Sequence, residues 1–225
     1  MNRTPARATA VSMIERRLSM LGGDQPRYTT RQEAILEAIE TVFLSEGFRR
    51  CTVRDLANRV GCSSRTLYEL APTKEELLHI VLERIWVRAS AHARAEMDRA
   101  PDPAAKLIAF LRSSVVILWS PWSNLMQDIL AYAPTSNRFE SHVHAAIGLL
   151  GDIVTEGIAI GQFHPVDATL IAEFLAAGAI RVASPDVLEQ VGMDAVDAIQ
   201  LVTENLLKGI LVQPSHATKP NNRKG

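Results

Sequence analysis

The chain has 225 residues, 47% of them hydrophobic and 22% charged, so it can bury one large core or two smaller ones. With two cysteines and 12 glycines, the composition excludes a collagen-like protein and a disulfide scaffold. The net charge of −1 is divided unevenly: residues 1–74 carry 12 Lys and Arg against 8 Asp and Glu, and residues 75–225 carry 12 against 17. A basic N-terminal third indicates a polyanionic partner for that part only.

No segment of the sequence has the character of a membrane span or a secretion signal. The longest uncharged stretch runs from Ser113 to Gln127, is too short to cross a bilayer and contains Pro121. Charged residues at positions 15–17 interrupt the apolar core that a signal peptide needs. We therefore expect a cytoplasmic protein with no membrane partner.

Residues 1–29 are expected to form a flexible, basic arm. They contain Thr-Pro, Gly-Gly and Gln-Pro pairs that break regular structure, with room for a helical turn or two around Val11 to Leu21. Five arginines lie in this arm, so it either follows a DNA minor groove or remains a solvated tail. The sequence leaves both interpretations open.

Three helices and the start of a fourth are predicted between residues 30 and 85. Apolar residues recur at helical spacing, and each run is bounded by a capping residue and a helix stop. The predicted caps are Thr30 with Glu33, Thr52 with Asp55, Ser63 or Ser64, and Thr73 with Glu76, and the predicted stops are Gly47, Gly61 and Pro72.

The rest of the chain keeps a helical pattern with longer elements, and no alternating strand pattern of useful length occurs. The expected fold class is all-α, with a C-terminal helical bundle over residues 86–213 and a flexible tail over 214–225. The helices expected beyond Pro101 lie near 103–119, 122–133, 138–161, 166–182 and 195–211.

The two short helices on either side of Gly61 predict a helix-turn-helix. Ala57 is small where the two helices approach, Gly61 permits the positive φ of a sharp turn, and Leu67 anchors the second helix inward. In such a motif the second helix enters the major groove of DNA. The alternative is an ordinary helical hairpin whose polar residues face water.

The longer motif "TVRDLANRVGCSSRTLYELAPTKEELL" resembles the DNA-binding head of the tetracycline-repressor-like (TetR) family of bacterial regulators, and the resemblance covers roughly residues 30–85. It implies that Thr52 caps its helix and touches a phosphate, and that Tyr68 and Lys74 contact the DNA backbone. Arg65 and Thr66 would lie in or near the groove. The DNA-binding residues implied are Thr52, Ser63, Ser64, Arg65, Thr66, Tyr68 and Lys74.

The sequence departs from this family pattern at two positions. Ala71 stands where the family usually has an aromatic residue, which removes packing beneath the turn. Glu69 places a negative charge near the phosphates, where it either accepts a hydrogen bond from a cytosine amino group or pairs with Arg65 one helical turn away.

The resemblance implies that the C-terminal helices bind a small ligand and form a homodimer. The last two predicted helices carry more apolar residues than one face within a monomer requires, and small residues there allow close approach. The alternative is a core packed within one chain. The residues expected in the dimer interface are Leu170, Phe174, Leu175, Gly178, Val202 and Leu206.

A ligand cavity is expected within residues 107–158, where aromatic and flexible apolar residues mix with a few polar ones. Each of these residues also fits a plain helical core. The candidates are Phe110, Trp119, Trp122, Met126, Phe139, His142 and Ile147. A small hydrophobic or amphipathic effector is inferred.

Catalytic chemistry is not expected. His142 and His144 lie two residues apart on different sides of a helix, so they cannot hold a metal jointly as an i, i+4 pair would. No nucleophile elbow or phosphate-binding loop is recognisable, and no cofactor or metal is predicted.

The combined expectation is a DNA-binding transcriptional regulator, with a ligand-relieved homodimeric repressor on a near-palindromic operator as the specific form. Such a protein would be cytoplasmic and associated with the nucleoid when bound to DNA. The alternative is a helical small-molecule or lipid carrier whose head, altered at Glu69 and Ala71, has lost its DNA affinity.

Overall fold

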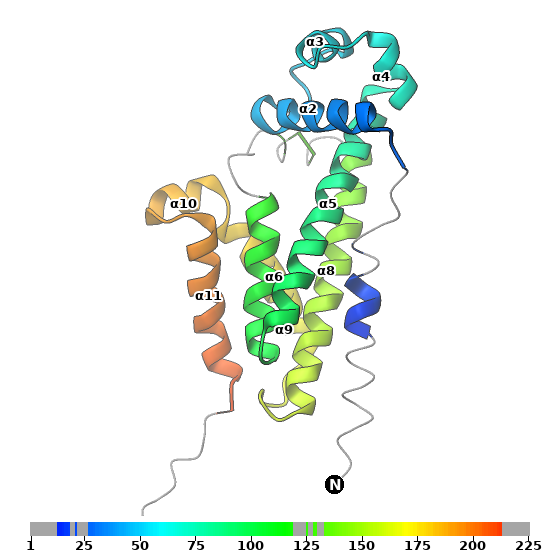
Figure 1. Ribbon diagram of the computed structural model, residues 1–225. Helices are drawn as coiled ribbons and strands as arrows, with labels where there is room; N and C mark the ends of the chain where they lie inside the picture. Colours follow the sequence, from blue (N-terminus) through cyan, green and yellow to red (C-terminus); the bar gives the residue numbers. More distant parts are fainter. Residues whose placement is uncertain are drawn as a thin grey trace, which may run out of the picture.

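The computed structural model describes residues 13–18, 21, 27–118, 125, 128–129 and 133–212. Within these residues all named elements are helices, which confirms the all-α expectation, and β-pairing is limited to an isolated bridge between Phe163 and Leu211. Figure 1 shows α2, α3 and α4 gathered at one end of the long helix α5, with α6 and α8 alongside the rest of α5 and α11 on the far side of α6. The helices are α2 (Thr30–Glu46), α3 (Val53–Arg59), α4 (Ser64–Leu70), α5 (Lys74–Arg99), α6 (Pro103–Leu118), α8 (Ala133–Ala159), α9 (Ala168–Val182), α10 (Pro185–Val191) and α11 (Ala195–Ile210).

Two prolines that the sequence pattern treats as helix breaks lie instead inside first turns. Pro134 is the second residue of α8, which begins at Ala133 rather than near residue 138, and Pro185 is the first residue of the unpredicted helix α10. Proline is tolerated there because the first N–H groups of a helix have no intrahelical acceptor. Most of the helix expected at 122–133 lies outside the described residues.

The predicted caps of α3 and α5 are confirmed, whereas the predicted cap of α2 is wrong by one residue. Thr29, not Thr30, is the N-cap of α2, and it forms a reciprocal capping box with Gln32. Both threonines precede an acid or amide by three residues, so spacing alone could not separate them. Glu33 is thereby left to form an ion pair with Arg84 of α5.

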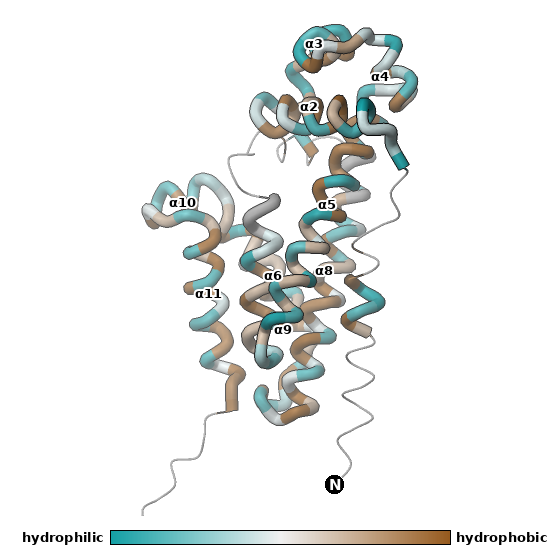
Figure 2. Tube along the Cα trace, in the orientation of Figure 1, coloured by the Kyte–Doolittle hydropathy of each residue, from teal (hydrophilic) through white to brown (hydrophobic). Residues whose placement is uncertain are grey.

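One hydrophobic cluster, called the head cluster below, holds the DNA-binding head together. It joins buried residues of α2, α3 and α4 to the first half of α5, and it also includes Leu125, Ile129 and Phe139 from beyond the head. Brown apolar positions recur along the helices in Figure 2, separated by teal polar ones, as expected of helices that bury one face. The largest fully buried side chains of this cluster are Leu36, Ile39, Phe43, Leu56, Leu67, Leu77, Leu78 and Ile129.

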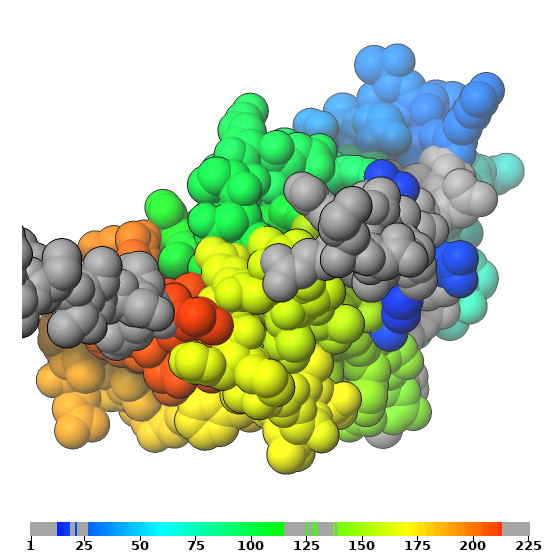
Figure 3. Space-filling view, turned by 90° about the horizontal axis from the view of Figure 1, so that it is seen from below, coloured from blue at the N-terminus to red at the C-terminus, as the bar shows by residue number. Residues whose placement is uncertain are grey.

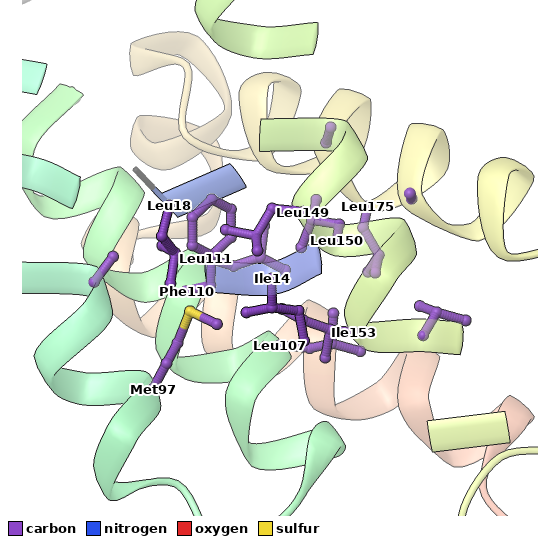
Figure 4. Packing of buried hydrophobic residues seen from close by; sticks show 14 of the residues in the cluster. Ile14, Leu18, Met97, Leu107, Phe110, Leu111, Leu149, Leu150, Ile153 and Leu175 are labelled. Carbon is purple, nitrogen blue, oxygen red and sulfur yellow. The ribbon is translucent and has the colours of Figure 1, made fainter. Parts of the chain in front are cut away.

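A second cluster, the body cluster, lies between the second half of α5 and helices α6, α8, α9 and α11. It also contains Ile14, Leu18 and Leu21, because residues 13–18 form a helix that packs against the body (Figure 4). The expectation of a flexible arm is therefore wrong for this part of residues 1–29. Its three apolar residues recur at i, i+4 and i+7, and burial of that face stabilises a segment that looked like a tail in the sequence.

Two ion pairs connect the head to α5. Arg84, which is almost fully buried, pairs with Glu33, and Arg88 pairs with Glu40, so two carboxylates of α2 contact two guanidinium groups of α5. A buried charge without its partner is costly, so these pairs hold α2 at one orientation across α5.

Among the described residues no single helix has the length and apolar character to cross a membrane, although α9 and α10 reach those criteria together as a pair bent by 74°.

We predict that Gly157→Ala destabilises the protein. A Cβ added at this α8 glycine would lie 2.2 Å from the ring of Phe163, which is fully buried, so the ring or the helix must shift. Overpacking of this kind costs about 1–3 kcal/mol. Gly151→Ala in the same helix is the control, because its new Cβ would be 3.8 Å from its nearest neighbours. Urea unfolding of the two variants measures the difference; equal stability would contradict the prediction.

Candidate DNA-binding surface and effector pocket

The turn between α3 and α4 has the geometry of a helix-turn-helix. Gly61 adopts φ +67°, and the Cys62 N–H donates to the Ala57 carbonyl at 3.0 Å, which closes the turn tightly. Ala57 and Leu67 are buried and join the two helices to the head cluster. The structure therefore fixes α4 on its inner side and leaves its outer side open to a partner.

Three of the predicted DNA-binding residues lie on the outer side of α4. Arg65 is exposed, Tyr68 remains 54% exposed despite its large ring, and Thr66 is half-buried at the first turn of the helix. Ser64 lies beside them, also half-buried, at the first position of α4. An exposed tyrosine beside an exposed arginine provides two kinds of hydrogen-bond donor, a hydroxyl and a guanidinium. Phosphate oxygens and the edges of guanine bases accept hydrogen bonds from such groups.

Glu69 adopts the second of the two roles considered for it. Its Oε1 accepts a hydrogen bond at 3.1 Å from Nε of Arg65, one turn earlier in α4. Both side chains are exposed, so the pair is weak and DNA phosphates can compete for the guanidinium.

Two predicted DNA contacts already use their hydroxyl groups within the head. The Thr52 hydroxyl accepts from the Asp55 N–H and donates to the Asp55 carboxylate, which also accepts from the Thr52 N–H. The two bonds to the carboxylate hold the pKa of Asp55 below its usual value. The Ser63 hydroxyl accepts from the Thr66 N–H as the cap of α4. The capping role expected of Thr52 is confirmed, and its phosphate contact stays a prediction.

Lys74 lies at the start of α5 as expected, and its ammonium group already has partners within the head. Its ammonium group donates to the backbone carbonyls of Phe48 and Cys51, at 3.1 and 2.9 Å, and lies 4.2 Å from the centre of the Phe48 ring. Lys74 thus connects the start of α5 to the loop between α2 and α3. It positions the head, and any phosphate contact has to share a group that already has these partners.

Ala71 compensates in part for the aromatic residue that the family pattern has at this position. It is buried in the head cluster, and its N–H donates to the Leu67 carbonyl at the end of α4. The smaller side chain therefore packs without leaving α4 uncapped.

A cavity of about 80 Å³, partly open to the surface, lies in the body between α5, α6, α8 and α9. Two serines and His142 are the polar residues among those described around it, and none of its described lining residues is charged. The lining consists of Leu21, Ala89, Ser90, Ala93, Phe110, Leu111, Ser114, Phe139, His142, Val143, Ala146, Leu150, Ala176, Ala179 and Ile180.

Three of the predicted ligand-binding residues, Phe110, Phe139 and His142, line this cavity. Ile147 does not line it and packs against the body cluster instead. Trp119, Trp122 and Met126 lie outside the described residues.

Most of the small residues of the cavity wall could not be recognised from the sequence. Alanines and serines of α5 and α9, such as Ala89, Ser90 and Ala176, have no side-chain chemistry that distinguishes a pocket from ordinary close packing. Leu21 was missed because its segment was interpreted as an arm.

His142 is the polar group best placed to recognise a ligand. Its ring stacks on Trp86 of α5, with centroids 4.7 Å apart and planes inclined by 13°. Burial away from water lowers the pKa of His142 from 6.5 to about 4, so the ring is neutral at pH 7. A neutral imidazole offers one donor and one acceptor to a ligand.

The cavity and the head share part of their walls. Phe139 lines the cavity and is buried in the head cluster, and Val143, one turn further along α8, lines the cavity and packs against the same cluster. A ligand that moves Phe139 therefore changes the packing beneath the head directly.

Comparison with known proteins identifies the head. Residues 35–81 match the family described as "Bacterial regulatory proteins, tetR family". This stretch includes α3, α4 and the turn whose geometry is given above. Residues 35–81 are therefore a DNA-binding domain of the TetR family.

Transcriptional regulators resemble this chain well beyond the head. The HTH-type transcriptional repressor KstR2 of Mycolicibacterium smegmatis is 25% identical over 158 residues, which cover 65% of this chain and 74% of that protein. The repressor NicS of Pseudomonas putida is 28% identical over 141 residues, covering 59% and 66%. This chain is accordingly a DNA-binding transcriptional regulator.

Solved structures share the fold over most of the chain. The fatty acid degradation regulator FadR from Bacillus halodurans superposes with a TM-score of 0.69 at 19% identity, covering 82% of this chain and 98% of that one. The ketosteroid transcriptional regulator KstR2 of Mycobacterium tuberculosis superposes with a TM-score of 0.59 at 23% identity, covering 83% and 98%.

We predict that Lys74→Met destabilises the head by about 2 kcal/mol, because two carbonyls lose a charged donor and the Phe48 ring loses its cation. Arg54→Met, at an exposed position of α3, is the control and should change stability by less than about 0.5 kcal/mol. Urea unfolding followed by circular dichroism compares the two, and similar midpoints would show that Lys74 has no positioning role.

A second prediction concerns pH. The folded pKa of His142, about 4, lies below its unfolded value of 6.5, so between these values the unfolded chain binds more protons. Stability should therefore fall as pH falls through this window. His142→Phe keeps a ring against Trp86 without a titrating group. Between pH 7 and pH 5 the parent should lose about 2 kcal/mol more than this variant at equal protein concentration. Parallel losses in urea unfolding would refute the assignment.

Proposed function

We propose that this protein is a homodimeric repressor that binds a near-palindromic operator and releases it when a small hydrophobic or amphipathic effector enters the body cavity. The proposal divides the chain into a DNA-binding domain at 30–85 and an effector and dimerisation domain at 86–213. The observation that carries it is the cavity wall shared with the head cluster through Phe139.

An apolar face on α9 supports dimerisation. Leu170 and Phe174 are 68% and 62% exposed, and with Gly178 they are spaced at i, i+4 and i+8, so they lie on one side of the helix. A Cβ added at Gly178 would meet no atom within 4 Å, so a second backbone has room to approach there. Large exposed apolar groups on one helix face are typical of an isologous interface.

The other three predicted interface residues are less exposed than Leu170 and Phe174. Leu175 lies about 100° round α9 from Phe174, is buried in the body cluster and is withdrawn from the proposed interface. Val202 and Leu206 of α11 are half-buried, and Leu206 packs against the body cluster. Leu201, 49% exposed, is the more accessible apolar residue of α11.

For DNA binding, α4 is the proposed recognition helix. Two copies of α4 related by a two-fold axis would read two half-sites, which is why a near-palindromic operator is expected. Arg65 and Thr66 would face the base edges, and the Tyr68 hydroxyl would donate to a phosphate. Thr52, Ser63, Ser64 and Lys74 would hold these groups in place at the DNA surface.

Relief by an effector follows from the position of α5. Its first residues carry the head through Lys74, and its middle residues Ala89, Ser90 and Ala93 line the cavity. A ligand that fits only one orientation of α5 shifts the population toward that orientation, in proportion to its differential affinity.

The relatives are consistent with an apolar effector and with repression. A ketosteroid regulator and a fatty acid degradation regulator are among the similar structures, and both descriptions name largely hydrocarbon compounds. Because the similar curated proteins are transcriptional repressors and regulators, the carrier alternative is not favoured.

Fluorescence anisotropy on duplexes that tile the DNA beside this gene tests the function. One tile should bind tightly in the presence of random competitor DNA, and affinity should fall steeply with salt as phosphate counterions are released. Tyr68→Phe should weaken binding to that tile about 25- to 100-fold, because each of the two heads loses one hydrogen bond worth about five- to tenfold. Weak, competitor-sensitive binding on every tile would remove the support for a local operator.

We predict that Phe174→Glu converts the dimer to monomers, because it would place two like charges in an apolar interface. Operator affinity should then fall about 100-fold or more, since the two heads no longer bind together. Thr155→Glu, at an exposed position of α8, adds the same charge elsewhere and is the control. Analytical ultracentrifugation gives the mass of each variant; a dimeric Phe174→Glu protein would disprove the interface.

A further inference from the structure

The body cavity is too small for a typical effector. Its volume is about 80 Å³, whereas pockets for drug-sized ligands measure about 300–1,000 Å³. A ligand of that size can enter only if a part of the wall moves. The question is therefore which part of the wall is held least firmly.

Four of the wall elements are long helices, and the fifth is the N-terminal strap, defined here as residues 13–18 and 21. Helices α5, α6, α8 and α9 pack against one another along the body cluster. The strap contributes Leu21 to the cavity lining and inserts Ile14 and Leu18 beside it (Figure 4). In the view of Figure 3, its dark-blue atoms lie on the outer surface of α8, on the side away from α11.

One ion pair latches the strap to α8. Nε of Arg17 lies 2.6 Å from the Asp152 carboxylate, and a Cβ added at Gly148 would be 2.1 Å from the Arg17 guanidinium. The glycine therefore provides the space in which the arginine lies. Arg17 is 37% exposed, so water and salt screen its guanidinium in part, whereas the Asp152 side chain is only 10% exposed and depends on this partner.

We propose that the groove beneath the N-terminal strap is the effector site, and that an uncharged, largely apolar ligand binds there by displacing Ile14, Leu18 and Leu21. This inference rests on the proposed function and extends it to the position and chemical class of the effector. The strap's own side chains occupy the groove in the ligand-free protein and are replaced by a ligand of similar character.

The lining of the groove sets the chemistry of that ligand. The strap fills it with three aliphatic side chains, and the cavity beside them has no charged residue among its described lining residues. An anion placed there would lose its hydration without gaining a partner, which is strongly unfavourable, and a cation would find a partner only by replacing Arg17 at Asp152. Ser90, Ser114 and the His142 ring can satisfy one or two hydrogen bonds of a hydroxyl or ketone. The neutral state of His142 agrees with this preference.

Full-length variants with an uncharged fluorescent dye, Nile red, test the strap. Arg17→Ala removes the ion pair. Gly148→Ala adds a Cβ where the guanidinium lies and so displaces it without enlarging the groove. Both should bind Nile red at least threefold more tightly than the parent. Gly151→Ala, in the same helix without a close contact, should bind like the parent. The proposal is overturned if neither Arg17→Ala nor Gly148→Ala binds the dye more tightly than Gly151→Ala.

Two probes of equal length test the ligand class. 1-Decanol should displace Nile red from the parent, whereas decanoate, which carries a charge, should do so at least tenfold less effectively. Saturating decanol should also accelerate amide hydrogen exchange in peptides that contain residues 13–21. Equal competition by decanoate, or slower exchange in the strap with decanol bound, would contradict the inference.

The operator assay separates this inference from the proposed function. If decanol displaces Nile red and frees the strap but leaves operator affinity unchanged, the site stands and ligand relief fails. If decanol weakens operator binding while exchange in residues 13–21 stays unchanged, the repressor function stands and the strap proposal fails.

Discussion

Helix α5 is the constraint on which the rest of the structure depends, because both hydrophobic clusters are built on it. Its first half, through Trp86, is buried in the head cluster, and Ala93 and Met97 are buried in the body cluster. The helix has 26 residues, which at 1.5 Å each makes it about 39 Å long. A continuous helix of this length transmits a change of orientation from one end to the other without needing a chain of intermediate contacts.

The head shows how residues outside the exposed side of α4 hold that helix in place. Thr52, Ser63 and Lys74 all belong to the family motif, yet each uses its polar group to satisfy backbone or capping partners within the head. These bonds fix the turn and the start of α5, so that Arg65 and Tyr68 stay exposed on a helix that is firmly anchored by Leu67. Binding energy can then go to the DNA rather than to ordering the helix.

The body combines a nearly apolar cavity with a wall that belongs to the head. Phe139 is common to both, and the Trp86–His142 stack links α5 to α8 next to it. Packed interiors respond to a new ligand by discrete repacking because they contain little free volume. The two ion pairs from α2 to α5 then move the head with α5 as one unit.

The sequence by itself determined the fold class, the helix-turn-helix, most helix limits and the family, because helical periodicity, caps and the glycine of a sharp turn are local signals. It also identified Phe110, Phe139 and His142 as cavity residues from their chemistry. Only the tertiary structure decided the partners of Lys74, the inward side of Leu175, the choice of Thr29 as a cap and the docking of residues 13–18 and 21 on the body. Each of these depends on which surfaces meet in the folded chain. Arg17 and Asp152 form an ion pair although they are far apart in the sequence, and nothing in the residues around either one predicts the other. Local order follows from neighbours in sequence, whereas burial and charge pairing follow from neighbours in space.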